Sequence, residues 1–124
     1  MIEQYEYCLE QEVKKILETP KGENLNYQIH TKVFNQYISK EDLDYGEEAP
    51  RYSEDFILAW EIILKYKNTI LFSGRKRFGQ ILQNVMSEVL GVKGGVIAFE
   101  DLIWHLTPEI ICKTALIYEL EKSS

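Results

Sequence analysis

TPEIICKTALIYEL, the stretch from Thr107 to Leu120, contains the clearest helix signals in this chain. Thr107 is a residue type that caps helix N-termini, Pro108 suits the first helical position, and Glu109 complements the positive end of the helix dipole. The residues that follow are mostly apolar, which predicts a helix over residues 107–120 that is apolar around most of its girth. A helix of this kind contacts neighbours on more than one side.

Other segments share the helical spacing of three and four residues between apolar side chains. The first of them has acids on its other face and lysines near its end, an order that suits the helix dipole. The predicted helices cover residues 2–18, about 25–37 with Asn24 as the candidate cap, 53–66 with Ser53 as the N-cap, and 78–90, which ends at Gly91. The 53–66 helix also carries apolar residues outside its core stripe.

Short apolar runs between these helices are typical of buried strands. They are TILF at residues 69–72 and VIAF at 96–99, and the second run can continue through LIW at 102–104. Strands this short need helices on both faces of the sheet to be stable. The sequence therefore predicts one domain over residues 1–124, a helix-rich α/β (α+β) fold with a small sheet, in which residues 1–20 form an accessory helix.

The chain has 124 residues, 45% of them apolar, and a formal net charge of −6. This charge disfavours general binding to nucleic acid or to anionic membranes. No stretch approaches the length of a membrane span, and the acidic N-terminus does not resemble a signal peptide. Cys8 and Cys112 lie in apolar helical patterns, which favours two free thiols and a cytoplasmic location.

The residue types that most catalytic sites need are sparse. His30 and His105 are the only histidines, and neither has a partner at metal-site spacing, so no metal or cofactor is expected. Cys112 lies on an apolar face, which indicates a packed and inert thiol.

Carboxylate catalysis needs two acids that converge in a pocket, whereas the acids here fall on exposed helix faces or in the 41–48 loop. Glu100 and Asp101 are the exception, because they interrupt an apolar run, and a turn or an exposed strand end is the alternative for them. We therefore expect a protein that is not an enzyme.

The middle of the chain has the opposite charge to the rest. Residues 65–93 contain six basic side chains and one acid, and glycines frame the segments SGRKRFG (73–79) and GVKGG (91–95). Glycines let backbone N–H groups approach an anion, arginines grip a phosphate through two hydrogen bonds, and an aromatic ring can stack on a base. The candidate phosphate or nucleotide site comprises Arg75, Lys76, Arg77, Phe78, Lys93 and Gly94. A solvated basic turn is the alternative.

Residues 39–51 form a polar connector in which Gly46 and Pro50 disfavour a regular element. A solvated loop is one interpretation. A partner-binding surface that imitates the charge of nucleic acid is the other. The acids that would form this surface are Glu41, Asp42, Asp44, Glu47 and Glu48.

Two motifs resemble a known family. APRYSEDFILAWEII (49–63) and the TPEIICKTALIYEL ending are similar to segments of the phage ABA sandwich domain family, and KVFNQYI (32–38) is similar to an early element of it. The similarity spans roughly residues 25–120. Lys113 and Thr114 stand where the family has arginine and alanine, and the helix at 78–90 is additional. The resemblance implies an α-β-α layered sandwich and a phage or prophage origin, but no activity.

Together these features predict a phage accessory protein in the host cytoplasm. It would act by stoichiometric binding, as a counter-defence protein that sequesters an anionic nucleotide-type ligand, without binding nucleic acid or membrane directly. An inhibitor of a host or defence protein, acting through the acidic connector, is the alternative. A small nucleotide-processing enzyme with Glu100 or Asp101 as the base and a structural accessory are further alternatives. The apolar girth of the 53–66 and 107–120 helices predicts a homodimer.

Overall fold

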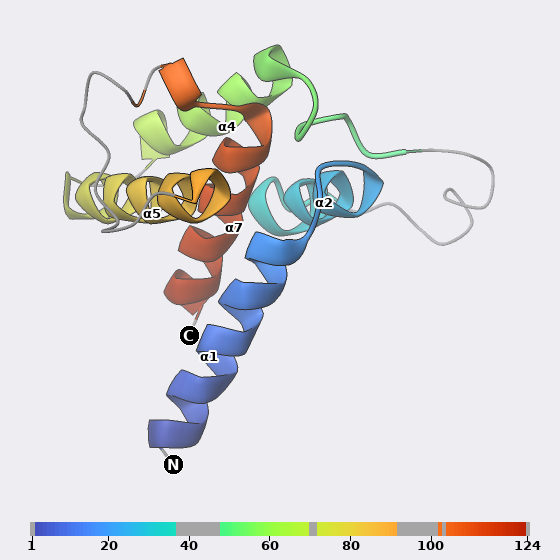
Figure 1. The fold of residues 1–124 in the computed structure, drawn as a ribbon. Coiled ribbons are helices and arrows are strands. Elements are labelled where there is room, and N and C mark those ends of the chain that lie inside the picture. Colours follow the sequence, from blue (N-terminus) through green and yellow to red (C-terminus); the bar gives the residue numbers. More distant parts are fainter. Residues whose placement is uncertain (1, 37–47, 70–71, 92–101, 103, 124) are drawn as a thin grey trace.

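The computed structural model (Figure 1) describes residues 2–36, 48–69, 72–91, 102 and 104–123. The helices are α1 (Ile2–Glu18), α2 (Glu23–Gln28), the π-helical turn η1 (Ile29–Val33), α4 (Phe56–Thr69), α5 (Phe72–Leu90) and α7 (Pro108–Ser123). α7 runs through the middle of the molecule, antiparallel to α1, so that the N- and C-termini point toward the same end (Figure 1).

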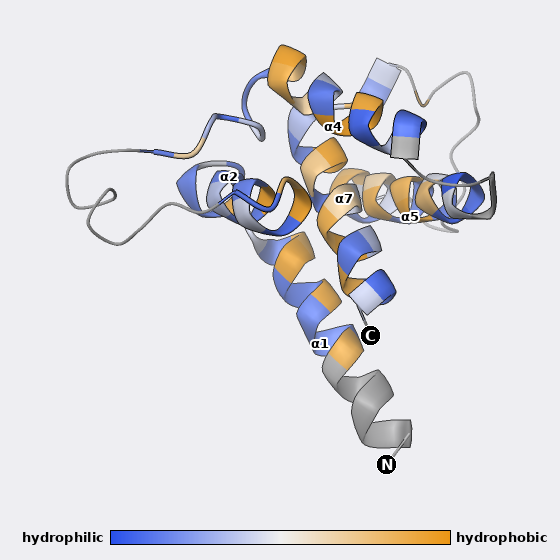
Figure 2. Cartoon of the chain, turned by 180° about the vertical axis from the view of Figure 1, so that it is seen from behind, coloured by the Kyte–Doolittle hydropathy of each residue, from blue (hydrophilic) through white to orange (hydrophobic). Residues whose placement is uncertain are grey.

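The fold is built around α7. Every residue from Ile110 to Tyr118 is buried, because α7 contacts α5, α4, η1, α1 and α2. Figure 2 shows the contrast with α1, whose described turns alternate apolar and polar residues, as expected for a helix with one solvated face. The predicted start of α7 is confirmed, since Thr107 Oγ1 accepts a hydrogen bond from the Ile110 N–H at 3.2 Å. Its end lies at Ser123, beyond the predicted Leu120.

The predicted α/β sandwich is wrong, because the residues that the model describes form helices and no strand. α4 extends to Thr69 and α5 begins at Phe72, so both ends of the expected TILF strand are helical. Leu102 and Trp104 are also helical, and VIAF (96–99) lies outside the described residues. Runs this short have no periodicity that separates a strand from a helical turn, so the sequence alone could not distinguish the two.

Helix boundaries differ from the predicted ones where local capping was misjudged. Residues 2–18 form a helix as predicted. α2 begins at Glu23, and the N-cap position belongs to Gly22, with φ of 138°, instead of Asn24. α4 begins at Phe56, because Asp55 Oδ1 accepts hydrogen bonds from the N–H groups of Ile57 at 2.9 Å and Leu58 at 3.4 Å. Ser53 is therefore not the N-cap.

Ser53 has a different role, in a buried polar contact that holds the start of α2 against the segment before α4. Its N–H and its hydroxyl both donate to Asn26 Oδ1, at 2.8 and 2.6 Å. Its Oγ also accepts a hydrogen bond from the Gly22 N–H at 2.9 Å. These contacts fix the direction in which α2 and η1 leave the turn after α1.

A lysine joins α1 to α7 at the other side of the same turn. Lys113 is buried on α7, and its Nζ donates to the Leu17 carbonyl oxygen at 2.8 Å and lies 3.4 Å from Glu109 Oε2. Carbonyls in the last turn of a helix lack intrahelical partners, so a lysine there satisfies one of them and complements the helix dipole. Across the helices that the model describes, none is long and apolar enough to cross a membrane.

Candidate functional site

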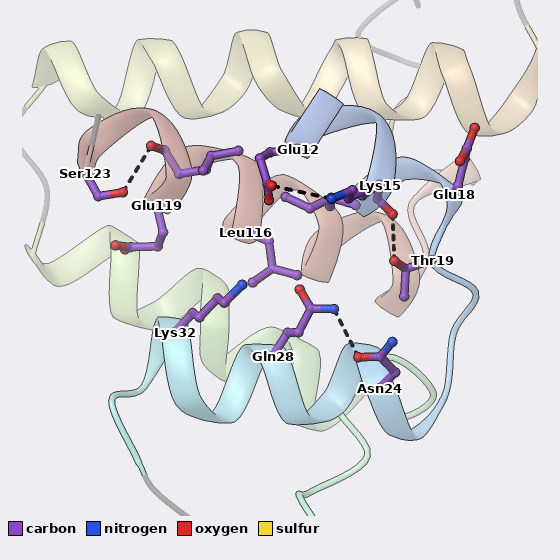
Figure 3. A pocket seen from close by; sticks show the side chains of 12 residues that line it. Glu12, Lys15, Glu18, Thr19, Asn24, Gln28, Lys32, Leu116, Glu119 and Ser123 are labelled. Carbon is purple, nitrogen blue, oxygen red and sulfur yellow. Dashed lines mark hydrogen bonds and ion pairs between the residues drawn. The ribbon is translucent and has the colours of Figure 1, made fainter. Parts of the chain in front are cut away.

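A pocket with a volume of about 880 Å³ opens between α1, the α2–η1 segment and α7 (Figure 3). Each wall is one face of a helix, because the lining residues recur at spacings of three and four. α1 contributes Glu12, Lys15, Ile16 and Glu18, and Thr19 follows it; α2–η1 contributes Asn24, Gln28 and Lys32; α7 contributes Leu116, Glu119, Leu120 and Ser123.

The floor of this pocket is aliphatic. Ile16 and Leu116 are buried side chains of the core, and Leu120 is packed against the same core. Ile16 comes from α1 and the two leucines from α7, so the floor forms where these antiparallel helices meet. An aliphatic floor beneath polar walls is the usual composition of a small-molecule site.

Most polar groups on the walls already have partners. Lys15 Nζ lies 3.7 Å from Glu12 Oε1, and the Thr19 hydroxyl donates to the Lys15 carbonyl oxygen at 2.6 Å. Gln28 Nε2 donates to Asn24 Oδ1 at 3.1 Å. In Figure 3 the Gln28 amide points into the pocket, toward Leu116. These contacts hold the wall side chains in place.

Lys32 differs from the other charged groups of the lining. Its side chain is exposed, extends toward Leu116 (Figure 3), and makes no hydrogen bond or ion pair with any residue that the model describes. It lies in η1, whose wide turn is closed by the Phe34 N–H, which donates to the Ile29 carbonyl oxygen at 3.2 Å. π-helical turns are rare and frequently occur at functional sites. Lys32 is thus the available cation of this pocket.

The η1 turn is supported from outside the pocket. The Phe34 ring stacks on the Tyr52 ring with centroids 5.2 Å apart, and the His30 ring also faces Tyr52, whose hydroxyl lies 3.5 Å from His30 Nδ1. Lys65 Nζ donates to the Val33 carbonyl oxygen. Because a π-helical turn leaves carbonyls without the usual partners, the Lys65 contact stabilises it from the neighbouring helix α4.

The predicted glycine-framed basic turn is helical. Residues 73–79 lie within α5, which begins at Phe72, so they do not form the predicted turn. Arg77 makes a two-point ion pair with Glu121, at 2.8 Å from Nε and 2.5 Å from Nη2. Arg75 Nη2 donates to the Lys67 carbonyl oxygen at 2.9 Å, and Lys76 is exposed.

Phe78 cannot stack on a base, because it is a core residue. Its ring centroid lies 5.0 Å from that of Tyr66 and 5.7 Å from that of Tyr118, in a cluster that joins α4, α5 and α7. The Tyr66 hydroxyl donates to Glu119 Oε1 at 2.7 Å. Burial and this hydrogen bond both raise the pKa of Tyr66, so the hydroxyl stays protonated and remains a donor.

Several predicted site residues fall where nothing is described. Lys93, Gly94, Glu100 and Asp101 lie outside the described residues, as do the connector acids Glu41, Asp42, Asp44 and Glu47. The last connector acid, Glu48, is exposed. The acidic partner-binding surface stays a prediction.

The Cys112 thiol belongs to the core, and the His30 ring faces Tyr52, whereas His105 is exposed. Cys112 is buried, and desolvation, with a smaller effect of the Glu109 charge, raises its pKa to about 12, so little thiolate forms near neutral pH. Among the residues that the model places, no group of three histidine, cysteine, aspartate or glutamate side chains could hold a metal ion.

The fold and this pocket define a helical protein with a cavity of the size that small ligands occupy. No family model matches the chain, and comparisons with curated proteins and with solved structures gave no match. The resemblance to the phage ABA sandwich domain family is untested by these comparisons, but the layered fold that it implied is wrong. The counter-defence role inferred from it stays a prediction.

The sequence did not predict this pocket, because its lining residues have the spacing of ordinary helix faces. Asn24, Gln28 and Lys32 follow one another at a spacing of four, which is typical of a solvated stripe. Leu116 and Leu120 read as core. One sequence feature could have indicated a pocket: the last helix is apolar around most of its circumference. Such a helix needs neighbouring helices on all sides, and grooves can form where those neighbours meet.

Proposed function

We propose that this chain acts by stoichiometric binding of a small monoanion that has an aliphatic portion, such as a short-chain carboxylate. The ligand would lie in the pocket between α1, α2–η1 and α7. One observation carries the proposal: Lys32, which has no described partner, extends toward Leu116 (Figure 3), and Leu116 and Ile16 are buried aliphatic residues of the pocket lining. An ammonium group beside an aliphatic floor complements an anionic head on an aliphatic body.

The size and charge of the lining select among anions. A volume of about 880 Å³ lies within the range of roughly 300–1,000 Å³ typical of small-molecule sites. Glu12, Glu18 and Glu119 also line the pocket, so a triphosphate would meet repulsion that a monoanion largely avoids. Among the described lining residues none is aromatic, so a nucleotide base has no ring to stack on. We therefore propose a smaller monoanion as the ligand, in place of the nucleotide-type ligand expected from the sequence.

The same lining supports the proposal of binding without turnover. The described part of the lining contains hydroxyls at Thr19 and Ser123 but neither histidine nor cysteine, so no nucleophile stands beside an imidazole base. The Thr19 and Ser123 hydroxyls donate to backbone carbonyls of their own segments, at 2.6 and 3.1 Å. Their protons are therefore engaged in local structure.

Calorimetric titration with a panel of linear and branched monocarboxylates, and with adenosine mono-, di- and triphosphates, tests the proposal. We expect saturable binding of at least one carboxylate and a preference for it over the triphosphate. Lys32→Gln should weaken that binding by tenfold or more, because a charge-assisted hydrogen bond contributes about 1.5–3 kcal/mol. Lys32→Arg should retain most of it.

Lys76→Gln is the matched control, since it removes the same charge from an exposed position on α5 that lies outside the pocket lining and makes no ion pair among the described contacts. It should leave the affinity within about twofold of the unmodified protein, because surface charges contribute little. The absence of saturable carboxylate binding would overturn the proposal. Equal weakening by Lys76→Gln and Lys32→Gln would show that the net charge of the protein, and not the pocket, binds the anion.

A further inference from the structure

An apolar face of α4 points away from the core. Phe56 is 44% exposed, Ile57 78%, Trp60 46% and Leu64 41%. The opposite face of the same helix is buried through Ala59, Ile62 and Tyr66. Leaving these large side chains in water is unfavourable, and exposed patches of this kind commonly mark interaction sites.

The spacing along this face matches a helix–helix seam. Ile57, Trp60, Leu64 and Lys67 follow at intervals of three, four and three residues, which is the a/d pattern of a coiled coil over about two heptads. The apolar residues of such a seam pack against a second helix that presents the same pattern. A second copy of this chain is one molecule certain to present it.

The sequence-based expectation of a homodimer also rested on the apolar residues of α7, but these are buried within the chain. α7 is buried from Ile110 to Tyr118 by its own neighbours, so its apolar girth needs no partner molecule. The α4 face has no such cover from the residues that the model describes. Only α4 therefore bears on self-association.

We propose that two copies of this chain pair through α4 in an antiparallel, two-fold arrangement. The charges at the two ends of the helix give the direction. At its N-terminal end the exposed acids Glu54 and Asp55 outnumber the exposed Arg51, and Lys67 is exposed near its C-terminal end. Arg75 joins Lys67 there, since its guanidinium donates to the Lys67 carbonyl oxygen at 2.9 Å.

Antiparallel pairing places each acidic end beside the basic end of the other copy. It also opposes the two helix dipoles favourably. Parallel pairing would set acid against acid and base against base. Glu61 borders the face near its middle, where it favours neither direction.

The contact is small, and this sets its strength. The four apolar side chains expose roughly 400 Å² together, given side-chain areas of about 150–250 Å². A standard interface buries about 800 Å² on each partner. The dimer should therefore be weak, with Kd in roughly the micromolar range. It leaves the carboxylate pocket untouched, because no α4 residue lines that pocket.

Sedimentation equilibrium from about 1 to 500 µM tests the pairing. The unmodified chain should pass from monomer to dimer over this range, and Leu64→Glu should raise Kd at least tenfold. Leu90→Glu is the matched control, because Leu90 is 42% exposed on α5 against 41% for Leu64 on α4, and it should leave Kd unchanged. Circular dichroism on both variants verifies that each is folded. A monomer throughout the range overturns the proposal, as does equal weakening by the two variants.

Charge reversal tests the direction of pairing. Lys67→Glu alone and Glu54→Lys alone should each weaken the dimer severalfold in low salt, because each brings like charges together at both ends. The double variant Glu54→Lys/Lys67→Glu should recover most of the affinity. A double variant that dimerises no better than either single one overturns the antiparallel arrangement.

Discussion

Two buried polar side chains, Lys113 and Asn26, make hydrogen bonds with groups on segments that are distant in sequence. Lys113 satisfies the Leu17 carbonyl at the end of α1, and Asn26 accepts two hydrogen bonds from Ser53. Such groups cost far more when one partner is removed than they contribute when paired. We therefore expect the loss of either side chain to destabilise the contact between the two segments that it connects.

Asn26→Ala should lower the free energy of unfolding by about 1–3 kcal/mol, because it leaves the buried Ser53 N–H without an acceptor. Urea denaturation followed by circular dichroism measures this loss. Asn24→Ala is the control, because Asn24 is exposed and bonds only to the Gln28 side chain within the described contacts. It should change the stability by less than about 0.5 kcal/mol. Equal stabilities for the two variants would contradict the role assigned to Asn26.

Helix existence could be predicted from periodicity, whereas helix ends depended on details that periodicity does not contain. Apolar spacing and capping residues correctly gave α1 and the start of α7. The start of α5 was placed six residues late, because Gly74 and Gly79 suggested a loop and the basic residues between them a phosphate site. Tertiary contacts overrode that local preference: Phe78 packs on Tyr66 and Tyr118, and Arg77 pairs with Glu121.

The effect of Gly79→Ala on stability distinguishes a helix from a loop at residues 73–79. Within α5, an added Cβ at Gly79 meets no atom within 4 Å, so alanine should stabilise the protein by about 0.5–1 kcal/mol. Gly91→Ala is the contrasting change, because Gly91 ends α5 with φ of 69°. It should cost about 1–2 kcal/mol. Thermal unfolding of both variants measures the signs, and a loss of stability in Gly79→Ala would contradict a helix through residues 73–79.

The described helices pack around α7, and the sequence correctly predicted a helix for the apolar stretch that forms it. What surrounds that helix was not predicted correctly, because short apolar runs fit a sheet or a helical turn equally well. The location of the pocket depends on how three helices meet, which no local pattern specifies. In the sequence, Lys32 belongs to the KVFNQYI motif and nothing marks it as a site residue, although its position in η1 makes it the available cation of the described pocket lining.

Backbone amide chemical shifts during titration with the best-binding carboxylate test the central claim most directly. We expect saturable shifts at Gln28, Lys32, Leu116 and Glu119, whose side chains line the pocket, and no comparable shifts over residues 73–79. Lys32→Gln should reduce these shifts at equal ligand concentration. The largest shifts at residues 73–79 or 41–48, or no saturable shift at any residue, would contradict a monoanion site between α1, α2–η1 and α7.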